Sequence, residues 1–552
     1  MLRKIILRRF NGLLKEYRNT LKNMIHMKGV GVMGSRKCFN IQSCVLLFSV
    51  IFLLFASTAI AAPKIAVYAY HSEPYIDLDP SVEYSNGIIP LQNVYETLTR
   101  YNARTKKIEP LLATKWVASS DGLKWTFTIR SGVKFHDGTN LTAKIVKDSI
   151  ERTMRLKKSA SYIWDAVKAI DTPNNTTVVF TLKNPSPMDL ICSASYAAFI
   201  MSPESMKMDS SWFNSGKDGG SGPYSIAKVQ KGEQIILKAF KDYWGGWKPD
   251  QFDGVIIKKY AESSARRQLV EKGEAQITEG LSATDLNALS KNPNVVVHAD
   301  PAWKNAIAFW NTQKSPLDNV NLRRALCYAY PYDEVVKNVL DGRAKKASGL
   351  VPVGLWGHSD KLGAPKFDMA KAKKYLALSG VDPKKCKFEV TFTSGYEEYR
   401  SAMQIYKTNL KKLGIDLNIH EMTWDSEWER SKNKNPKDRQ DLLIMNWWPD
   451  YPSPLSWFYT LMHSEKNISF NLSYINNPKI DKLIEEADTK TVVNRKEAEN
   501  IFINLQEIAI DQAYFINMFD REACWVVNKN VKGFYNNPAY ETVVFFYDLR
   551  TK

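Results

Sequence analysis

Strand-like and helix-like segments alternate along the C-terminal half of the chain, and this order restricts the possible folds more than any other feature. Apolar residues at every second position predict a strand at 388–392, which a predicted helix near 397–413 follows. A second strand is expected at 415–419, and a polar loop at 431–439 separates it from a short apolar strand at 442–445. Strands that alternate with helices in this way predict an α/β domain whose sheet is covered on both faces.

The N-terminal half shows the same two kinds of segment. Alternating apolar residues predict strands at 125–129 and 178–182, and Thr142 is placed to cap a helix that follows it. The chain has 552 residues, too many for one hydrophobic core, so two or three domains are expected. We find no internal repeat in the sequence.

The first 62 residues differ in composition from the rest. They carry ten Lys and Arg residues but only one acid, Glu16, and they contain an apolar run from Val45 to Ile60. Small residues at 59–62 form an A-x-A pattern just before Pro63. This order predicts a signal peptide that is cleaved on export, with retention as a membrane anchor as the alternative. Because residues 1–32 make a long leader, Met33 is an alternative start of translation.

Charge and cysteine usage narrow the class of protein further. The net charge is +18, and removing the leader's nine positive charges leaves +9 on the mature part, where basic and acidic residues are interleaved, as at 258–274. This arrangement gives no support for nucleic-acid binding. Cys44 precedes the apolar run instead of closing it, so no lipoprotein cysteine is predicted, and the expected location is the periplasm.

The mature part has four cysteines whose spacing matches no zinc or redox motif. An oxidising compartment would permit one or two disulfides, whose pairing the sequence leaves open. Cys327 lies in an apolar helical stretch and is expected to be a buried thiol. The four residues are Cys192, Cys327, Cys386 and Cys524.

Several separated blocks resemble one family. The stretch LLATKWVASSDGLKWTFTIRSGVKFHDGTNLTA at 111–143 closely resembles the signature of solute-binding protein family 5, the extracytoplasmic peptide, nickel and opine receptors of ABC importers. Further blocks follow in the order typical of that family: GSGPY (220–224), DYWGG (242–246), RRQLVEKGEAQI (266–277) and WNTQKSPLDNVNLRRALCYA (310–329).

The resemblance implies an α/β fold: a two-lobed periplasmic-binding-protein clamshell with an additional α/β domain beside a discontinuous first lobe. Ligand would be enclosed between the lobes. The turn-like clusters at 219–224 and 298–303 are candidate points where the chain crosses between lobes. The expected segments are 1–62 for the signal peptide and leader, 63–110, 218–301 and 525–552 for the first lobe, 111–217 for the additional domain, and 302–524 for the second lobe.

The stretch NWWPDYPSPLSWFYTL at 446–461 is the most informative for ligand binding. It aligns with the family segment that carries a ligand-facing aspartate, and the match implies that Asp450 receives the α-ammonium group of a peptide. A carboxylate suits this role because a buried ammonium group needs charge-assisted hydrogen bonds to offset its desolvation. The alternative is that Asp450, between two prolines, only caps a turn.

The same alignment places Met445, Asn446, Trp447 and Trp448 along the cleft, where their backbone would pair with an extended peptide. Neighbours on a strand point in opposite directions, so one tryptophan should face the ligand and the other the core. The match favours Trp448 as the ligand-facing one.

Two further residues come from the match. Trp424 aligns with an aromatic residue that walls the pocket, with an ordinary core tryptophan as the alternative. Asp77 lies in the segment IDLDP (76–80), which corresponds to a ligand-proximal loop of the first lobe, where backbone groups are expected to matter more than side chains.

No partner for a ligand carboxylate stands out, and Arg266 and Arg267 are candidates by charge alone. No cofactor and no metal are expected, because the six histidines of the mature part do not pair at ligand spacing. We find neither G-x-S-x-G nor H-E-x-x-H, so a secreted hydrolase is the less favoured class.

The sequence therefore predicts an exported, non-enzymatic and monomeric solute-binding protein. It would capture a small molecule or short peptide by closure of its lobes and deliver it to the permease subunits of an ABC importer. A nickel chelate, an opine and an oligosaccharide are the alternative ligands for the same fold.

Overall fold

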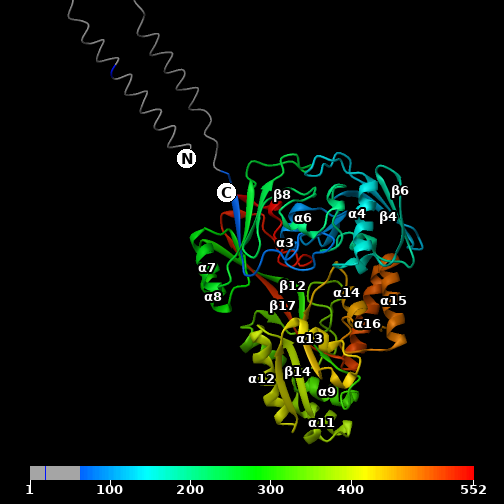
Figure 1. Cartoon of the computed structure of the whole chain (residues 1–552). Helices are drawn as coiled ribbons and strands as arrows, with labels where there is room; N and C mark the ends of the chain where they lie inside the picture. Colours follow the sequence, from blue (N-terminus) through cyan, green and yellow to red (C-terminus); the bar gives the residue numbers. More distant parts are fainter. Residues whose placement is uncertain (1–18, 20–62, 552) are drawn as a thin grey trace, which may run out of the picture. The chain divides into compact units, whose positions relative to one another are not determined.

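A single sheet of eleven strands extends through the part of the chain that the structure, a computed structural model, describes, namely Asn19 and residues 63–551 (Figure 1). Residues 63–552 form one unit, and the expectations for the leader at 1–62 fall outside the described residues, apart from Asn19. No helix in the described part is both long enough and apolar enough to cross a membrane. The sheet order is β15 (Asp416–Met422), β14 (Lys387–Thr393), β16 (Leu442–Trp447), β12 (Val295–Trp310), β17 (Phe515–Asn528), β11 (Ile277–Glu279), β1 (Ile65–Tyr70), β10 (Gly254–Lys259), β9 (Gln234–Ala239) and β8 (Tyr224–Gln230), with β13 (Ala344–Lys345) beside β17.

Two long strands, β12 and β17, join the two ends of this sheet. They pair antiparallel from Val295 and Asn528 to Phe309 and Phe515. Strands β1 and β8–β11 at one end belong to the first lobe, and β14–β16 at the other end belong to the second lobe (Figure 1). The two lobes therefore share one pair of strands.

The expectation of a turn at 298–303 is wrong, because these residues lie inside β12. The pairing register shifts between Pro301 and Asn305, where the proline cannot donate a backbone hydrogen bond. The chain therefore passes between the lobes in an irregular but continuous strand. The proposed lobe boundaries near 301 and 524 both fall within such strands.

The first lobe mixes parallel and antiparallel pairing. β1 runs parallel to both β10 and β11, whereas β8, β9 and β10 form an antiparallel series. Its helices are α3 (Ile88–Val94), which is buried throughout, α7 (Ser263–Lys272) and α8 (Ala283–Leu289). Helix α6 (Ser210–Asn214) lies near the end of segment 111–217.

Segment 111–217 contains a separate antiparallel sheet. Its order is β4 (Ala113–Ala118), β5 (Lys124–Ile129), β7 (Thr177–Leu182) and β6 (Val167–Asn174). Helix α4 (Ala143–Leu156) packs against it and begins at Thr142, whose hydroxyl accepts from the backbone N–H of Ile145, as the sequence predicts. Both guanidinium nitrogens of Arg152 on α4 donate to the carboxylate of Asp79 at 2.7 Å, which joins this domain to the first lobe. The segment also holds α5 (Met188–Ile191) and the short 3-10 helix η2 (Ser161–Trp164).

The second lobe has its own core between β14–β16 and the helices around them. Cys327 is buried there, as expected. Its helices are α9 (Val320–Ala329), α10 (Tyr332–Glu334), α11 (Met369–Ser379), α12 (Glu397–Lys411) and α13 (Trp424–Ser431).

The last helices pack toward the additional domain. Side chains of α14 (Leu455–Leu461), α15 (Pro478–Val493) and α16 (Arg495–Asp511) share one hydrophobic cluster with the first lobe and segment 111–217. The four cysteines of the described part are all free thiols. Two short strand pairs complete the fold: β2 (Thr99–Asn102) with β3 (Lys107–Pro110), and β18 (Val531–Lys532) with β19 (Arg550–Thr551).

Candidate functional site at the end of strand β16

Strand β16 ends at the boundary between the two lobes. On one side its residues 442–447 pair with Asn305–Trp310 of β12. On the other side, the pairing with β14 stops where Ile444 meets Phe392. The edge of residues 445–447 that faces away from β12 therefore has no strand neighbour among the described residues. Such an edge has the geometry for pairing with an extended peptide.

Trp447, the last residue of β16, and Trp448, the residue after it, have different surroundings. Trp447 is 6% exposed, its indole Nε1 donates to the carbonyl of Ser456 at 3.1 Å, and its ring packs on Phe470. Trp448 is 37% exposed, and the ammonium group of Lys304 lies 4.9 Å from its ring centroid. The alternation predicted from the sequence is present, with Trp448 as the accessible member of the pair.

Asp450, three residues after β16, is a buried carboxylate at the boundary between the lobes. Its side chain is buried, with 3% of the residue exposed, and its carboxylate accepts hydrogen bonds from the hydroxyls of Tyr84 and Tyr162. Tyr84 lies in the first lobe and Tyr162 in η2, so the carboxylate is contacted from across the lobe boundary. The Asp450 carbonyl also accepts from the backbone N–H of Ser195 at 2.9 Å.

The electrostatics of Asp450 favour a cationic ligand. Burial raises the pKa of its carboxyl group from 3.8 to about 6, although the hydrogen bonds from Tyr162 and Tyr84 act in the opposite direction. No basic side chain in residues 63–551 forms an ion pair with it. Within the described part of the chain, the carboxylate also accepts no backbone hydrogen bond of the kind a turn cap would make. A buried carboxylate with polar contacts but no cation is a suitable partner for an ammonium group.

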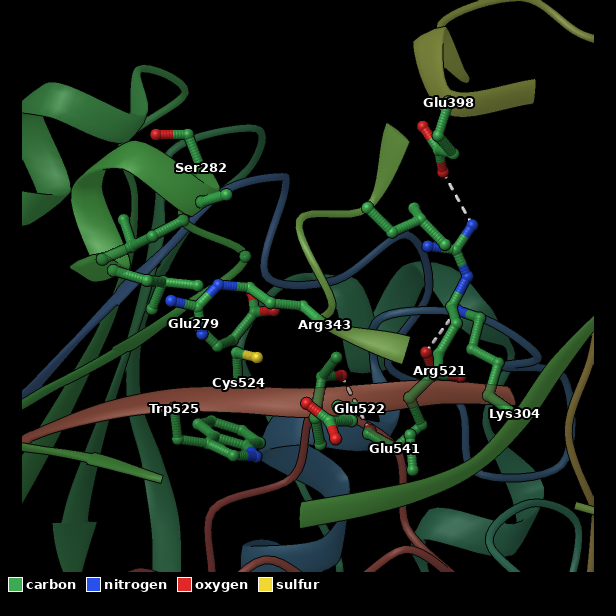
Figure 2. Close-up of a pocket in the computed structure, with 18 of the residues that line it drawn as sticks. Glu279, Ser282, Lys304, Arg343, Glu398, Arg521, Glu522, Cys524, Trp525 and Glu541 are labelled. Atoms are coloured by element: carbon green, nitrogen blue, oxygen red, sulfur yellow. Dashed lines mark hydrogen bonds and ion pairs between the residues drawn. The ribbon is translucent and has the colours of Figure 1, made fainter. Parts of the chain in front are cut away.

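Asn446 links this segment to a cavity between the lobes. Its side-chain oxygen accepts from Nε of Arg521 at 2.8 Å. The cavity, of about 780 Å³, is lined by α8 and the segment before it, by the start of α12, and by β17 (Figure 2). Figure 2 shows Ser282 on one side of it and Glu398 on the other, with Cys524 and Trp525 on the strand below.

Four of the eight charged side chains that line the cavity form ion pairs with one another. Lys304 forms an ion pair with Glu541, and Arg521 forms one with Glu398 at 2.7 Å. Arg343 donates to Asn287 of α8. The walls thus offer both signs of charge to a ligand with an amine and a carboxylate.

The other residues predicted from the sequence are less well placed to contact a ligand in the cavity. Met445 is partly buried against the hydrophobic core. Trp424 begins α13, is 42% exposed and stacks on Trp428 with ring centroids 5.2 Å apart, so it is not a core tryptophan. The Asp77 carboxylate accepts from the backbone N–H of Asp79 and from the side-chain amide of Asn214, so it holds its loop against α6. None of the seven predicted residues lines the 780 Å³ cavity directly.

Arg266 and Arg267 have structural partners. Arg266 is buried and donates to three backbone carbonyls, those of Tyr260, Ala261 and Gly280. Arg267 pairs with Glu271 and Asp285 on the surface of α7 and α8. Neither lines the cavity, so neither is placed to bind a carboxylate there.

Sequence reasoning missed the cavity arginine Arg521 and the tyrosines Tyr84 and Tyr162. Nothing in their local sequence marks them, because each reaches the site only through contacts distant in the chain. Within the described residues, no group of three or more His, Cys, Asp or Glu side chains is arranged to hold a metal ion.

Comparison with known proteins decides the family. The family model described as bacterial extracellular solute-binding proteins, family 5, matches residues 107–469. The chain belongs to this family. Family 5 proteins bind solutes and are not enzymes, so the hydrolase alternative is set aside.

Relatives within family 5 carry peptide-related names. The probable D,D-dipeptide-binding periplasmic protein DdpA of Escherichia coli is 30% identical over 481 residues, which cover 84% of this chain and 90% of the relative. The periplasmic binding protein DppA of Helicobacter pylori, solved with the peptide STSA, is 25% identical with a TM-score of 0.75, covering 89% of this chain and 98% of that one.

The family fold also serves other ligands. NikZ of Campylobacter jejuni, solved with Ni(L-His), has a TM-score of 0.73 at 21% identity and covers 89% of this chain and 100% of its own. Its likeness supports the two-lobed α/β fold alone. The identity of this chain's ligand must therefore be inferred from the residues of this chain.

Proposed function

We propose that this chain is the exported binding component of an ABC importer and that it captures a short peptide between its lobes. The observation that carries the proposal is the Asp450 carboxylate, which is buried at the lobe boundary and forms no ion pair with any of the described residues. A peptide's α-ammonium group would supply the missing charge. The hydroxyls of Tyr84 and Tyr162 already contact the same carboxylate and would help to enclose the amine.

The open edge of β16 supports the same ligand. Backbone groups of residues 445–447 that have no strand partner match the repeating donors and acceptors of an extended peptide. Trp448 next to them offers an accessible aromatic face. Binding through the backbone would allow the protein to accept peptides of differing sequence. The peptide-related names of the relatives agree with this assignment.

Capture would work by a shift in the populations of open and closed forms. A ligand that contacts both lobes stabilises the form in which they meet, and only this difference in affinity drives closure. The closed form would then dock on a permease in the inner membrane, where ATP hydrolysis supplies the work of transport. The chain would act as a monomer, released into the periplasm by cleavage near residue 62.

Native mass spectrometry of gently purified protein tests the proposal, followed by calorimetry with di-, tri- and tetrapeptides. We expect a co-purified mass that fits a peptide and saturable binding of at least one peptide class. A co-purified opine, sugar or nickel chelate, together with no heat from any peptide, would contradict it.

A further inference from the structure

A second cavity, which we call the back cavity, adjoins the strand that joins the two lobes. Its volume is about 400 Å³, and it is lined by the β2–β3 hairpin, by residues 298–303 of β12, by Gly354 and by segment 534–538. Along β12, Ala302 and Lys304 line the cavity between the lobes, whereas Pro301 and Trp303 line the back cavity. Because neighbours on a strand point to opposite faces, the two cavities adjoin β12 from opposite sides.

The walls of the back cavity are aromatic. Tyr101 and Trp303 are both buried, with ring centroids 5.0 Å apart, and Phe534 and Tyr535 complete the wall. Trp303 has a φ of 49°, in the left-handed region that bulky residues rarely adopt. It lies where the pairing of β12 with β17 shifts its register, between Pro301 and Asn305. The irregularity of the strand thus places a large aromatic ring of β12 against the first-lobe hairpin.

The indole N–H of Trp303 is an unused donor in this cavity. Trp303 is only 3% exposed, yet within residues 63–551 its Nε1 has no hydrogen-bond partner and is not fully enclosed by protein. Gly354, which also lines the cavity, lies beside it, since a Cβ at that position would be 3.2 Å from Nε1. Burial lowers the pKa of His298 in the same wall, so its imidazole adds a neutral polar group rather than a charge. A buried N–H that faces a cavity requires an acceptor there.

Cations outnumber acids around the back cavity. The guanidinium group of Arg104 forms no ion pair within the described chain; Nη2 donates to the carbonyl of Gly533 at 2.6 Å, and the central carbon lies 4.2 Å from the ring centroid of Tyr535. Lys106 likewise has no charged partner among the described residues. Asp300 is the one acid among the lining residues, and it too lacks an ion pair there. The cavity therefore offers a ligand two unpaired positive charges and one unpaired negative charge.

Asn536 connects the back cavity with the cavity between the lobes, because it lines both. Its side-chain amide donates to the carbonyl of Pro301 at 3.1 Å. Its side-chain oxygen accepts from Nε1 of Trp525, a residue of the cavity between the lobes, at 3.0 Å. An occupant of the back cavity would contact the first-lobe hairpin, the joining strand and Gly354 of the second-lobe segment.

We infer that the back cavity is a second binding site, which takes a free aromatic amino acid. The ring would lie among the aromatic walls, where it buries apolar surface in a ring-on-ring arrangement. The carboxylate would face the cations Arg104 and Lys106, and the ammonium group would face Asp300. The volume lies at the small end of the range for ligand pockets, which suits a single amino acid. This inference does not depend on what the cavity between the lobes binds.

Calorimetry with L-tryptophan tests the site. We expect the wild-type protein to bind it saturably, with a Kd of about 1 mM or below. Tryptamine, which lacks the carboxylate, should bind at least about tenfold more weakly, because it loses charge-assisted contacts with the unpaired cations. Indole-3-propionate, which lacks the ammonium group, and L-alanine, which lacks the ring, should also bind more weakly than L-tryptophan.

Two variants test whether the binding takes place in the back cavity. Arg104→Gln should weaken L-tryptophan at least about fivefold, and Trp303→Phe, which keeps an aromatic ring but removes the N–H, should weaken it about threefold or more. Lys107→Gln removes an exposed cation of the same hairpin that does not line the cavity, and it should bind L-tryptophan as the wild type does. Melting curves establish that each variant is folded. Should Trp303→Phe not fold, Arg104→Gln, a change at an exposed residue, decides the test.

Asp450→Asn separates this site from peptide capture. Without peptide it should bind L-tryptophan within about twofold of the wild type, and a larger loss would place tryptophan in the peptide site and overturn the inference. Equal affinity in the wild type, Arg104→Gln and Trp303→Phe would overturn it as well. So would the lack of saturable L-tryptophan binding up to about 10 mM, which would leave the cavity to water. If L-tryptophan binds as expected but no peptide does, the proposed function fails and the back-cavity site stands.

Contacts with both lobes should couple the two sites. Saturating L-tryptophan should change the affinity for peptide at least about fivefold, and bound peptide should change the affinity for L-tryptophan by the same factor. Arg104→Gln should leave peptide affinity unchanged when tryptophan is absent. Peptide affinity that is equal with and without saturating L-tryptophan would show that the occupant does not distinguish the open from the closed form, and would overturn the coupling.

Discussion

The carboxylate of Asp450 lies 3.1 Å from the hydroxyl of Tyr84, although 366 residues separate the two in the chain. Tyr84 precedes α3 in the first lobe, and Asp450 follows β16 in the second, so this hydrogen bond bridges the lobes. The hydroxyls of Tyr84 and Tyr162 donate hydrogen bonds to the carboxylate but do not neutralise its charge. That difference is the basis for expecting an ammonium group as its partner.

Replacing Asp450 by asparagine should weaken peptide binding by about 2–5 kcal/mol, because it leaves a bound ammonium group without its counter-charge. The melting temperature of the ligand-free protein should change little or rise, since a buried carboxylate without a cation is removed. Calorimetry with a peptide that the wild-type protein binds measures the loss. Asp77→Asn is the matched control and should bind normally, because the Asp77 carboxylate accepts its hydrogen bonds from Asp79 and Asn214. Full affinity in Asp450→Asn would exclude amine capture by this residue.

Peptide affinity should depend on pH in a predictable direction. Burial raises the pKa of Asp450 to about 6, so the carboxylate becomes protonated, and affinity should fall, as the pH drops below that value. Above about pH 8 affinity should fall again, because the peptide's α-amino group loses its proton. Titrations between pH 5 and pH 9 should give a bell-shaped curve. The acid limb should vanish in Asp450→Asn, and its persistence there would assign the titration to another group.

The same raised pKa has the opposite effect on the ligand-free fold. A carboxyl group that binds its proton more tightly when folded destabilises the protein at high pH. This penalty is fully present above about pH 6, shrinks as the pH falls and vanishes below the unfolded-state pKa of 3.8. As the pH rises through about 6, ionisation of Asp450 should therefore increase the affinity for peptide and decrease the stability of the ligand-free protein.

Much of the scaffold was predictable because local patterns specify it. The helix expected near 397–413 is α12 at Glu397–Lys411, and the strand expected at 442–445 is β16 at Leu442–Trp447. The opposite orientation of Trp447 and Trp448 follows from the two-residue period of a strand. These features depend on neighbours in the sequence.

The parts that escaped prediction depend on distant contacts. Pro301 suggested a turn, yet pairing with β17 on both sides of a register shift carries β12 through it. Tyr84 and Tyr162 become site residues only because the fold brings them to Asp450. Arg521 is one charged residue among many until Asn446 and Glu398 orient it.

Asp488 offers a test of the contact between α15 and the additional domain. Its buried carboxylate accepts only a 3.4 Å hydrogen bond from Ser186, and Oδ1 has no partner within the described structure. Burial raises its pKa to about 7. Asp488→Asn should therefore stabilise the fold at pH 8 by an amount on the order of 1–4 kcal/mol, and the gain should shrink toward pH 4.5.

Thermal or urea unfolding at both pH values measures this effect. Glu486→Gln removes an exposed charge from the same helix and should change the free energy of unfolding by less than about 0.5 kcal/mol. An Asp488→Asn variant that is less stable than wild type at pH 8 would show that the ionised carboxylate has a partner worth more than its desolvation.

Cys524 provides a reporter inside the cavity. It lines the space between the lobes and is partly exposed, whereas Cys192, Cys327 and Cys386 are buried. Burial raises the pKa of its thiol, with Arg343 acting in the opposite direction, so labelling should be slow near neutral pH and faster above pH 8. Among these four cysteines, maleimide should modify Cys524 first, as measured by peptide mapping in a mass spectrometer.

Bound peptide should slow this labelling, because the ligand fills the cavity and stabilises the form in which the lobes meet. In Asp450→Asn the same peptide concentration should give little protection, since the amine contact that drives occupancy is lost. Cys524→Ser removes the thiol and so shows whether the labelled proteolytic fragment has been assigned to the correct cysteine. If a peptide that calorimetry shows to be bound leaves the labelling rate of Cys524 unchanged, the ligand lies outside this cavity.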